Sequence, residues 1–138
     1  MAELSPRLAA VLEALPLREG LRVLEVGCGP GALARAMAER VGATGSVLGI
    51  DRSPTAIQAA ERVSDHGSLD FRVAAIERFR LMGRERPFDL VVAIRVGALD
   101  GRQPELEAEA LARLASATVP GASVYIDRGD PLTAIPLH

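Results

Sequence analysis

An acidic residue and three closely spaced glycines lie near the start of the chain. Glu25 lies inside the apolar stretch 21–26, which runs directly into the segment GCGPG at 27–31. Glycine adopts backbone angles that other residues avoid, and it lets a ligand approach the main chain closely. A helix that begins after such a turn offers unpaired N–H groups and a partial positive charge. A strand, a glycine turn and a helix in this order are typical of nucleotide-type binding corners in α/β folds.

The glycine spacing separates this turn from two commoner nucleotide-binding loops. Dinucleotide-binding turns usually read G-x-G-x-x-G and phosphate loops read G-x-x-x-x-G-K-[ST], whereas this turn reads G-x-G-x-G. The chain contains no lysine, which excludes a phosphate-loop lysine. The segment VLEVGCGPG resembles motif I of the class I S-adenosylmethionine-dependent methyltransferases.

This resemblance implies that S-adenosylmethionine is the cofactor and that S-adenosylhomocysteine is its product. It implies that Glu25 helps to hold the methionine end of the cofactor; the alternative is a charge exposed at the end of the sheet. A bare carboxylate in an apolar strand is costly to bury and needs partners. The turn residues expected to contact the cofactor are Gly27, Cys28, Gly29 and Gly31.

A second acidic residue, Asp51, follows the apolar stretch 46–50. A carboxylate there can accept hydrogen bonds from both ribose hydroxyls, and the acidic residue at this position does so in the resembling family. NAD-binding folds use the same geometry, so Asp51 indicates a nucleoside without naming it. The alternative role is a turn or cap residue before Ser53 and Pro54. Arg52 is expected along the adenine–ribose edge, with a solvated side chain as the alternative.

The segment after the apolar stretch 69–74 departs from the family pattern. The resembling enzymes often place Gly-Asp-Ala there, and the Asp contacts the adenine amino group. This chain has Ala74, Ala75 and Ile76, so the carboxylate is absent at Ala75. We expect Ile76 to pack on the adenine face and the backbone near it to bond the ring.

The reacting end is expected after the fourth apolar stretch, where FDLVV at 88–92 resembles the family's fourth strand. Arg95 suits a bidentate clamp on a substrate carboxylate or phosphate, and it would also border the cofactor. The alternative is an ion pair of Arg95 with Asp100 or Asp127. Methyl transfer from a sulfonium is an in-line displacement that needs a base only when the nucleophile must lose a proton early. The candidate catalytic residues are Arg95, Asp127 and Asp100, the last two as bases.

Composition narrows the classes of function. The 138 residues are 49% hydrophobic and 25% charged with a net charge of −2, which is typical of globular proteins and argues against a nucleic-acid partner. The lone Cys28 is read as a small residue in the turn, and no disulfide or metal site is expected. No apolar run suits a membrane span and no signal peptide is recognisable, so a cytoplasmic location is expected. His66 is read as a surface residue.

Apolar stretches alternate with helical patterns along the chain. Strands are predicted over 21–26, 46–50, 69–74, 88–96 and 122–127. Helices are predicted over 5–15, 33–41, 53–63 and 103–114, with a short helix or loop over 77–83. The alternation predicts an α/β, Rossmann-like, doubly wound fold, with a mostly parallel five-stranded sheet and helices on both faces. Ligands are then expected at the carboxyl ends of the strands.

The C-terminal tail, 129–138, raises the question of what covers the fifth strand. We expect one domain over 1–138 with its core at 5–128. The tail contains two prolines and is not expected to supply the two further strands that the family usually adds. Since exposed edges tend to be covered or paired, tail residues Leu132, Ile135 and Leu137 or a second subunit should cover it. A homodimer through this edge or the tail is preferred.

Three functions remain open at this point. The leading interpretation is S-adenosylmethionine-dependent methyl transfer to an unidentified acceptor, with a small molecule favoured, near Arg95 and Asp127. The alternative is a methyltransferase-like domain that binds the cofactor, lacks independent catalysis and acts with a partner. A nicotinamide-dependent oxidoreductase is the third, and the glycine spacing counts against it.

Overall fold

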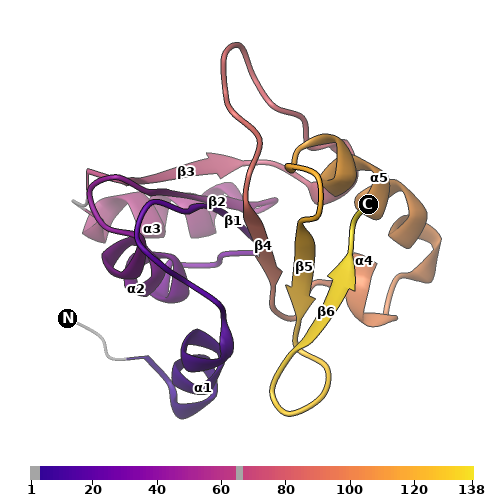
Figure 1. The fold of residues 1–138 in the computed structure, drawn as a ribbon, viewed down its shortest axis with the longest axis horizontal. Coiled ribbons are helices and arrows are strands. Elements are labelled where there is room, and N and C mark those ends of the chain that lie inside the picture. The colour runs from indigo at the N-terminus through magenta and orange to yellow at the C-terminus, as the bar shows by residue number, and fades with distance from the viewer. Residues whose placement is uncertain (1–3, 65–66) are drawn as a thin grey trace.

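A six-stranded sheet with helices on both faces is formed by the residues that the computed structural model describes, 4–64 and 67–138 (Figure 1). The strand order is β3-β2-β1-β4-β5-β6. The strands are β1 (Arg22–Val26), β2 (Ser46–Asp51), β3 (Leu69–Val73), β4 (Leu90–Ala93), β5 (Ser123–Ile126) and β6 (Thr133–Pro136). β1 to β5 run parallel to one another, which confirms the expected α/β fold and the mostly parallel sheet. His66 lies outside the described residues.

The helices begin largely where the caps predict. The α-helices are α1 (Pro6–Ala14), α2 (Ala32–Val41), α3 (Pro54–Val63), α4 (Gly97–Asp100) and α5 (Glu107–Ser116), and the 3₁₀ turns are η1 (Ile76–Arg78) and η2 (Pro104–Leu106). The Ser5 hydroxyl accepts a hydrogen bond from the Leu8 N–H at 3.2 Å, and Ser53 accepts one from the Ala56 N–H at 3.2 Å. These contacts satisfy N–H groups that a helix start leaves unpaired. The short helix α4 was not expected.

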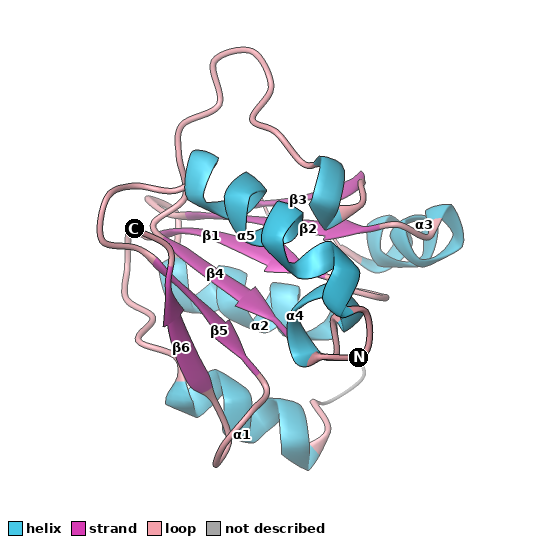
Figure 2. Ribbon diagram, turned by 90° about the vertical axis from the view of Figure 1, so that its right-hand side faces the viewer, coloured by secondary structure: helices cyan, strands magenta, loops and turns pink. Residues whose placement is uncertain are grey.

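Helices lie on both faces of the sheet (Figure 2), and an apolar layer lies between the sheet and the helices on each face. One layer joins α1 and α2 to the sheet through residues such as Leu12 and Met37, and the other joins η1, α4 and α5 through residues such as Leu114. Val23 and Leu24 are adjacent in β1 and both fully buried, one in each layer. A parallel strand covered on both faces reads as a continuous apolar run, which is why β1 was recognisable in the sequence.

The tail forms one strand, β6, so the predicted count of five strands was wrong, whereas the tail does not supply two further strands, as expected. β6 pairs antiparallel with β5, and Val124 lies opposite Ile135. Pro136 is tolerated because it lies at the end of an edge strand, where a missing N–H breaks no ladder. As expected of the tail, Leu132, Ile135 and Leu137 pack on the core. The uncovered β5 edge that motivated the homodimer therefore does not exist.

None of the described helices has the length and apolarity that a membrane crossing requires.

Candidate functional site

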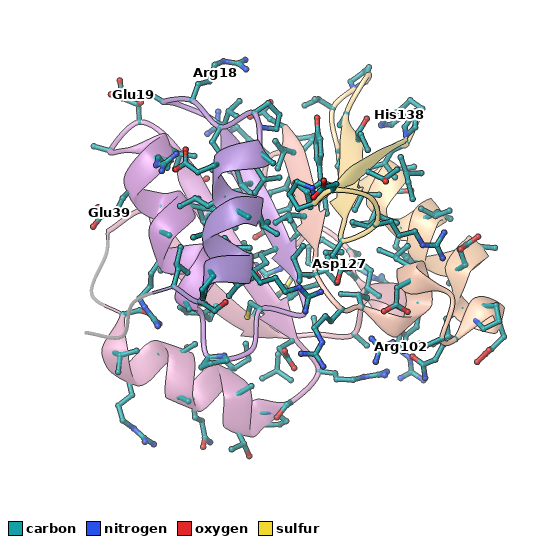
Figure 3. The ribbon with its side chains drawn as sticks, turned by 90° about the horizontal axis from the view of Figure 1, so that it is seen from below. Arg18, Glu19, Glu39, Arg102, Asp127 and His138 are labelled. Carbon is teal, nitrogen blue, oxygen red and sulfur yellow. The ribbon has the colours of Figure 1, made fainter. Side chains whose placement is uncertain are left out.

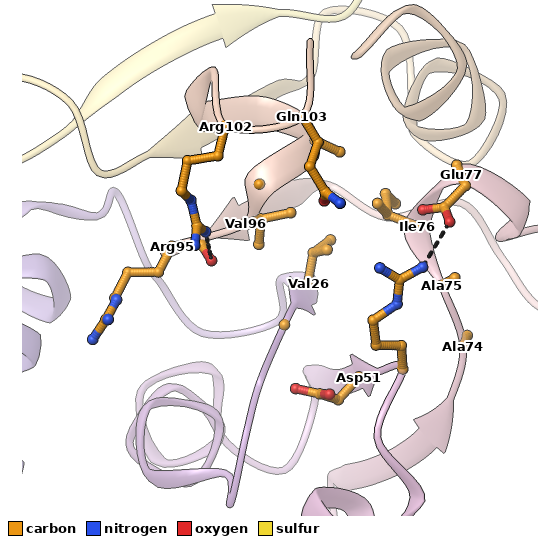
Figure 4. Close-up of a pocket in the computed structure, with 14 residues that line it drawn as sticks. Val26, Asp51, Ala74, Ala75, Ile76, Glu77, Arg95, Val96, Arg102 and Gln103 are labelled. Carbon is orange, nitrogen blue, oxygen red and sulfur yellow. Dashed lines mark hydrogen bonds and ion pairs between the residues drawn. The ribbon is translucent and has the colours of Figure 1, made fainter. Parts of the chain in front are cut away.

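A pocket of about 530 Å³ lies at the carboxyl ends of the parallel strands, where the strand order reverses between β1 and β4 (Figure 4). Its wall is made of Val26, Gly27, Asp51, Arg52, Ala74, Ala75, Ile76, Glu77, Arg95, Val96, Gly97, Ala98, Arg102 and Gln103. Six of the residues singled out in the sequence therefore meet there: Gly27, Asp51, Arg52, Ala75, Ile76 and Arg95. The other six lie outside the lining: Glu25, Cys28, Gly29, Gly31, Asp100 and Asp127. The position and volume are those of a small-molecule site in an open α/β sheet.

The three glycines of the turn have different surroundings. All three have positive φ, +70° at Gly27, +54° at Gly29 and +90° at Gly31. A Cβ at Gly31 would lie 2.7 Å from Cζ of Phe71, so this glycine permits close packing of the turn on β3. A Cβ at Gly27 would lie 3.0 Å from Cγ2 of Val96, which follows β4 where the strand order reverses. Gly29 has nothing within 4 Å of its Cβ position, so open space borders the turn there.

Asp51 ties the end of β2 to the glycine turn. Its Oδ2 accepts a hydrogen bond from the Gly29 N–H at 2.9 Å, and its Oδ1 accepts one from the Ser53 N–H at 2.9 Å. The turn-and-cap role considered for Asp51 is therefore present. Each carboxylate oxygen can accept a second bond. Asp51 also lines the pocket, so its carboxylate has acceptor capacity left for ribose hydroxyls.

Glu25 is buried beneath the turn with an unsatisfied oxygen. Its residue is 4% exposed, which excludes the alternative of a charge exposed at the end of the sheet. Oε1 of Glu25 has no hydrogen-bond partner among the described residues. Burial, followed by the nearby charge of Asp51, raises the pKa of Glu25 to about 8. The backbone of Ala34 hydrogen-bonds the Glu25 carboxylate, so the unsatisfied oxygen is Oε1. A buried carboxylate oxygen without a partner calls for a cation or a further donor, and the ammonium group of a methionine moiety has that chemistry.

Cys28 faces away from the pocket opening and into the sheet. Its N–H donates to the Ile50 carbonyl at 2.9 Å, and its Sγ lies 3.0 Å from the position of a Cβ at Gly49. Burial, with the charges of Glu25 and Asp51, raises the pKa of the Cys28 thiol to about 12. A thiol held protonated is a poor nucleophile, so the interpretation as a small packing residue agrees with the geometry.

An ion pair that the sequence analysis missed borders the pocket at the end of β3. Nη2 of Arg52 lies 2.9 Å from Oε2 of Glu77, and Figure 4 draws this contact as a dashed line. The Glu77 side chain is 17% exposed and the Arg52 side chain 60%. Arg52 is therefore not a solvated side chain without a partner. Ile76 is buried and offers an apolar surface to the same pocket.

Near the ends of β4 and β5, two carboxylates form ion pairs with arginines other than Arg95. Asp127 pairs with Arg7, and Asp100 pairs with Arg102 at 2.8 Å. Arg95 contributes its backbone, with its N–H donating to Oδ1 of Asp127 at 3.1 Å and its carbonyl accepting from Nη2 of Arg102 at 2.6 Å. The alternative considered for Arg95, an ion pair with Asp100 or Asp127, does not form among the described residues, because other arginines hold both carboxylates.

The Arg95 side chain makes no ion pair with any described residue. Its backbone is left-handed, with φ at +59°, which is uncommon outside glycine. Figure 4 shows the side chain extending away from Asp51, and Figure 3 shows Asp127 and Arg102 on the same side of the molecule. The chemistry available here is one exposed guanidinium beside two carboxylates that are already paired. Within the described ranges, no three His, Cys, Asp or Glu side chains converge as a metal site.

Comparison with known proteins gives consistent matches. A family model described as a methyltransferase domain matches residues 17–126. The ubiquinone biosynthesis O-methyltransferase of Methylocella silvestris is 42% identical over 80 residues, which are 56% of this chain and 29% of that protein. The protein-L-isoaspartate O-methyltransferase of Methanothrix thermoacetophila is 44% identical over 59 residues, which are 42% of this chain and 28% of that protein.

Solved structures match over most of this chain. An arsenic(III) S-adenosylmethionine methyltransferase from Chlamydomonas reinhardtii has a TM-score of 0.67 and 25% identity, covering 91% of this chain and 51% of that one. A chain of the complex between the Haloferax volcanii Trm112 methyltransferase activator and a methyltransferase has a TM-score of 0.69 and 26% identity. The match covers 87% of this chain and 50% of that one. This chain thus spans about half the length of these structures, and its matches to the curated proteins above cover less than a third of them.

Proposed function

Because the chain belongs to the class I S-adenosylmethionine-dependent methyltransferase family, we propose that it binds S-adenosylmethionine in the pocket where the strand order reverses and transfers the methyl group to an acceptor. When bound, the cofactor supplies an electrophilic methyl group on a sulfonium. The proposal treats the 138 residues as one functional domain. The observation that carries it is the buried, unpartnered Oε1 of Glu25 beneath a glycine turn that Asp51 holds in place.

The residues on the cofactor side have separate tasks in this proposal. Glu25 provides the negative charge for the ammonium end, directly or through the turn formed by Gly27, Cys28, Gly29 and Gly31. Asp51 accepts from the ribose hydroxyls while its bond to the Gly29 N–H keeps the turn in position. Arg52, Ala75 and Ile76 border the base. Preorganised polar groups reduce the ordering cost of binding.

On the acceptor side, the proposal assigns Arg95 to an anionic group of the acceptor. Its guanidinium is the residue type that binds carboxylate or phosphate bidentately, and its competing carboxylates are paired elsewhere. Holding the nucleophile in line with the methyl group supplies much of the rate. Where the nucleophile must first lose a proton, Asp127 or Asp100 accepts it after release from its arginine. A small acceptor is favoured, and its identity follows from a screen of anionic O, N and C nucleophiles.

A second candidate is a domain that binds the cofactor and needs a partner for catalysis. Two findings favour it: the chain spans about half of the solved relatives, and one of these was solved in a complex with a methyltransferase activator. A second copy of this chain as that partner is a further prediction. Cofactor binding without turnover, restored by a partner, distinguishes this candidate from an independent enzyme.

The test is calorimetric titration with S-adenosylmethionine and S-adenosylhomocysteine, using NAD and NADP as controls. We expect micromolar binding of the adenosyl compounds and none of the nicotinamides. Asp51→Ala should weaken binding about tenfold to a hundredfold, because hydrogen bonds to a charged group are lost. Asp70→Ala, an exposed carboxylate on β3, is the matched control and should bind normally. Failure of the wild-type protein to bind either adenosyl compound would overturn the proposal.

A further inference from the structure

The pocket wall holds one carboxylate oxygen that the proposed function leaves without a role. Glu77 has a largely buried side chain, 17% exposed, and Arg52 holds its Oε2 at 2.9 Å. Its other oxygen, Oε1, accepts no hydrogen bond from the described residues. Figure 4 shows this carboxylate beside Ile76, on the inner side of the segment that follows β3. An acceptor is thus held in a fixed orientation at the wall of the pocket.

The order of the strands indicates which part of a nucleoside would reach Glu77. The pocket lining follows three successive strand ends: Gly27 after β1, Asp51 at the end of β2, and 74–77 after β3. Neighbouring strands are about 4.8 Å apart. A ribose at Asp51 therefore places its base roughly one strand spacing further, against the segment 74–77. Ile76 gives the base an apolar surface there.

The polar groups available at this end are few. Ala74, Ala75 and Ile76 have no polar side-chain atoms, so Glu77 supplies the side-chain acceptor from the segment after β3. Adenine presents an amino group at position 6, which donates, whereas hypoxanthine presents a carbonyl oxygen there, which accepts. A carboxylate held by a guanidinium accepts only, and its bonds to N–H donors are strong.

We propose that Glu77 recognises the 6-amino group of the cofactor's adenine through Oε1, taking the place of the carboxylate that is absent at Ala75. Arg52 is then a positioning residue, which orients Glu77 from the end of β2. The inference rests on the proposed function, because it requires an adenosyl ligand in this pocket. It makes Glu77 the residue that determines base specificity.

The experiment compares S-adenosylhomocysteine with its 6-oxo analogue, S-inosylhomocysteine, by calorimetry. Wild-type protein should prefer the adenine compound by about tenfold to a hundredfold, the worth of one hydrogen bond to a charged acceptor. In Glu77→Gln the preference should fall to within about threefold, because a side-chain amide accepts from an amino group and donates to a carbonyl. Glu77→Ala should also lose most of the preference. Glu39→Gln, exposed on α2, is the control and should retain it.

The ratio of the two affinities separates recognition from a merely structural role. If the Arg52–Glu77 pair only braces the segment after β3, the Glu77 variants should bind both compounds more weakly by the same factor and keep the wild-type ratio. That result would overturn the inference, as would a wild-type protein that binds both compounds equally. Wild-type protein that binds neither compound contradicts the proposed function itself, and with it the inference.

Discussion

The two halves of the sheet's carboxyl edge are held together in different ways. At the ends of β1 and β2, Asp51 accepts two backbone N–H groups, and its partners Gly29 and Ser53 lie within 22 residues of it. At the ends of β4 and β5, exposed arginines hold the carboxylates, and the pair Arg7–Asp127 joins residues 120 apart. The ends of β1 and β2 are joined through backbone donors, whereas Asp127 and Asp100 each accept one backbone N–H and are held in addition by long side chains that can rearrange.

This difference separates two requirements of group transfer. A site for one unvarying ligand gains from rigidity, because little freedom is lost when the ligand binds. A site for an acceptor that must enter and leave gains from charges that exchange partners at low cost, since exposed ion pairs contribute little. We therefore expect perturbations of the β1–β3 half to have large effects on stability and cofactor binding, and perturbations of the β4–β5 half to have small ones.

Gly31→Ala should be the most damaging change in the first half. The new Cβ would lie 2.7 Å from Cζ of Phe71 with φ at +90°. Left-handed strain costs about 1–3 kcal/mol and overpacking about 1–3 kcal/mol. We expect the free energy of unfolding to fall by about 2–5 kcal/mol, measured by urea denaturation.

Two other glycines separate strain from packing. Gly83→Ala has φ at +54° and no atom within 4 Å of the new Cβ, so it should show the strain alone. Gly29→Ala has the same φ and the same open space around the new Cβ, but Gly29 lies in the glycine turn. Its free energy of unfolding should therefore match that of Gly83→Ala, while S-adenosylhomocysteine should bind it more weakly than the wild-type protein. Equal losses of stability for all three variants would mean that the packing on Phe71 is unimportant.

Glu25 should give the ligand-free protein a distinctive pH dependence. The pKa of Glu25 is about 8 in the folded protein against an ordinary value of 4.5. Between these values the folded state binds a proton that the unfolded state has released, so stability is greatest below the lower value and falls as pH rises through the window. The slope is up to about 1.4 kcal/mol per pH unit.

Glu25→Gln should remove this slope. Urea unfolding of both proteins at several pH values between about 5 and about 8 measures it. The free energy of unfolding of the variant should increase relative to that of the wild type as pH rises, because the other carboxylates contribute equally to both proteins. Parallel curves of the free energy of unfolding against pH would contradict this prediction. They would show that Glu25 is ionised in the folded state and that its charge is compensated within the β1–β3 half.

Arg7→Ala should have the smallest effect, because the Arg7 side chain is 52% exposed. Removing an exposed pair typically costs about 0.2–1 kcal/mol. A double-mutant cycle with Asp127→Ala measures the coupling. A coupling above about 2 kcal/mol would contradict the comparison, because the β4–β5 half would then be as firmly held as the other.

The features that were predicted from the sequence depend on residues close together in the chain. The caps at Ser5 and Ser53 lie within three residues of the N–H groups they accept from, and the glycine turn is five residues long. The features that were missed depend on distant partners. With 16 arginines and 18 acidic residues, spacing alone does not indicate that Arg7 meets Asp127 or that Arg52 meets Glu77.

The tail shows the same limit for a strand. Thr133–Pro136 has two strand-breaking signals nearby, in Pro131 and Pro136, and little apolar character of its own. It becomes a strand because it pairs with the edge of β5 and because Ile135 and Leu137 pack against the apolar core. Such pairing depends on context more than on propensity.

The strand order also divides the chain at one place along its length. β1, β2 and β3 end at residue 73, and β4, β5 and β6 begin at residue 90, so each half of the sheet is one continuous segment joined through the β1–β4 pairing. The loop between them projects from the body of the molecule (Figure 1). A genetic crossover within that loop, after residue 77, would transmit residues 25–77 intact and exchange β4, β5 and β6 together. Under the proposed function, chimeras with relatives would thus inherit the residues proposed for the nucleoside from one parent and those proposed for the acceptor from the other.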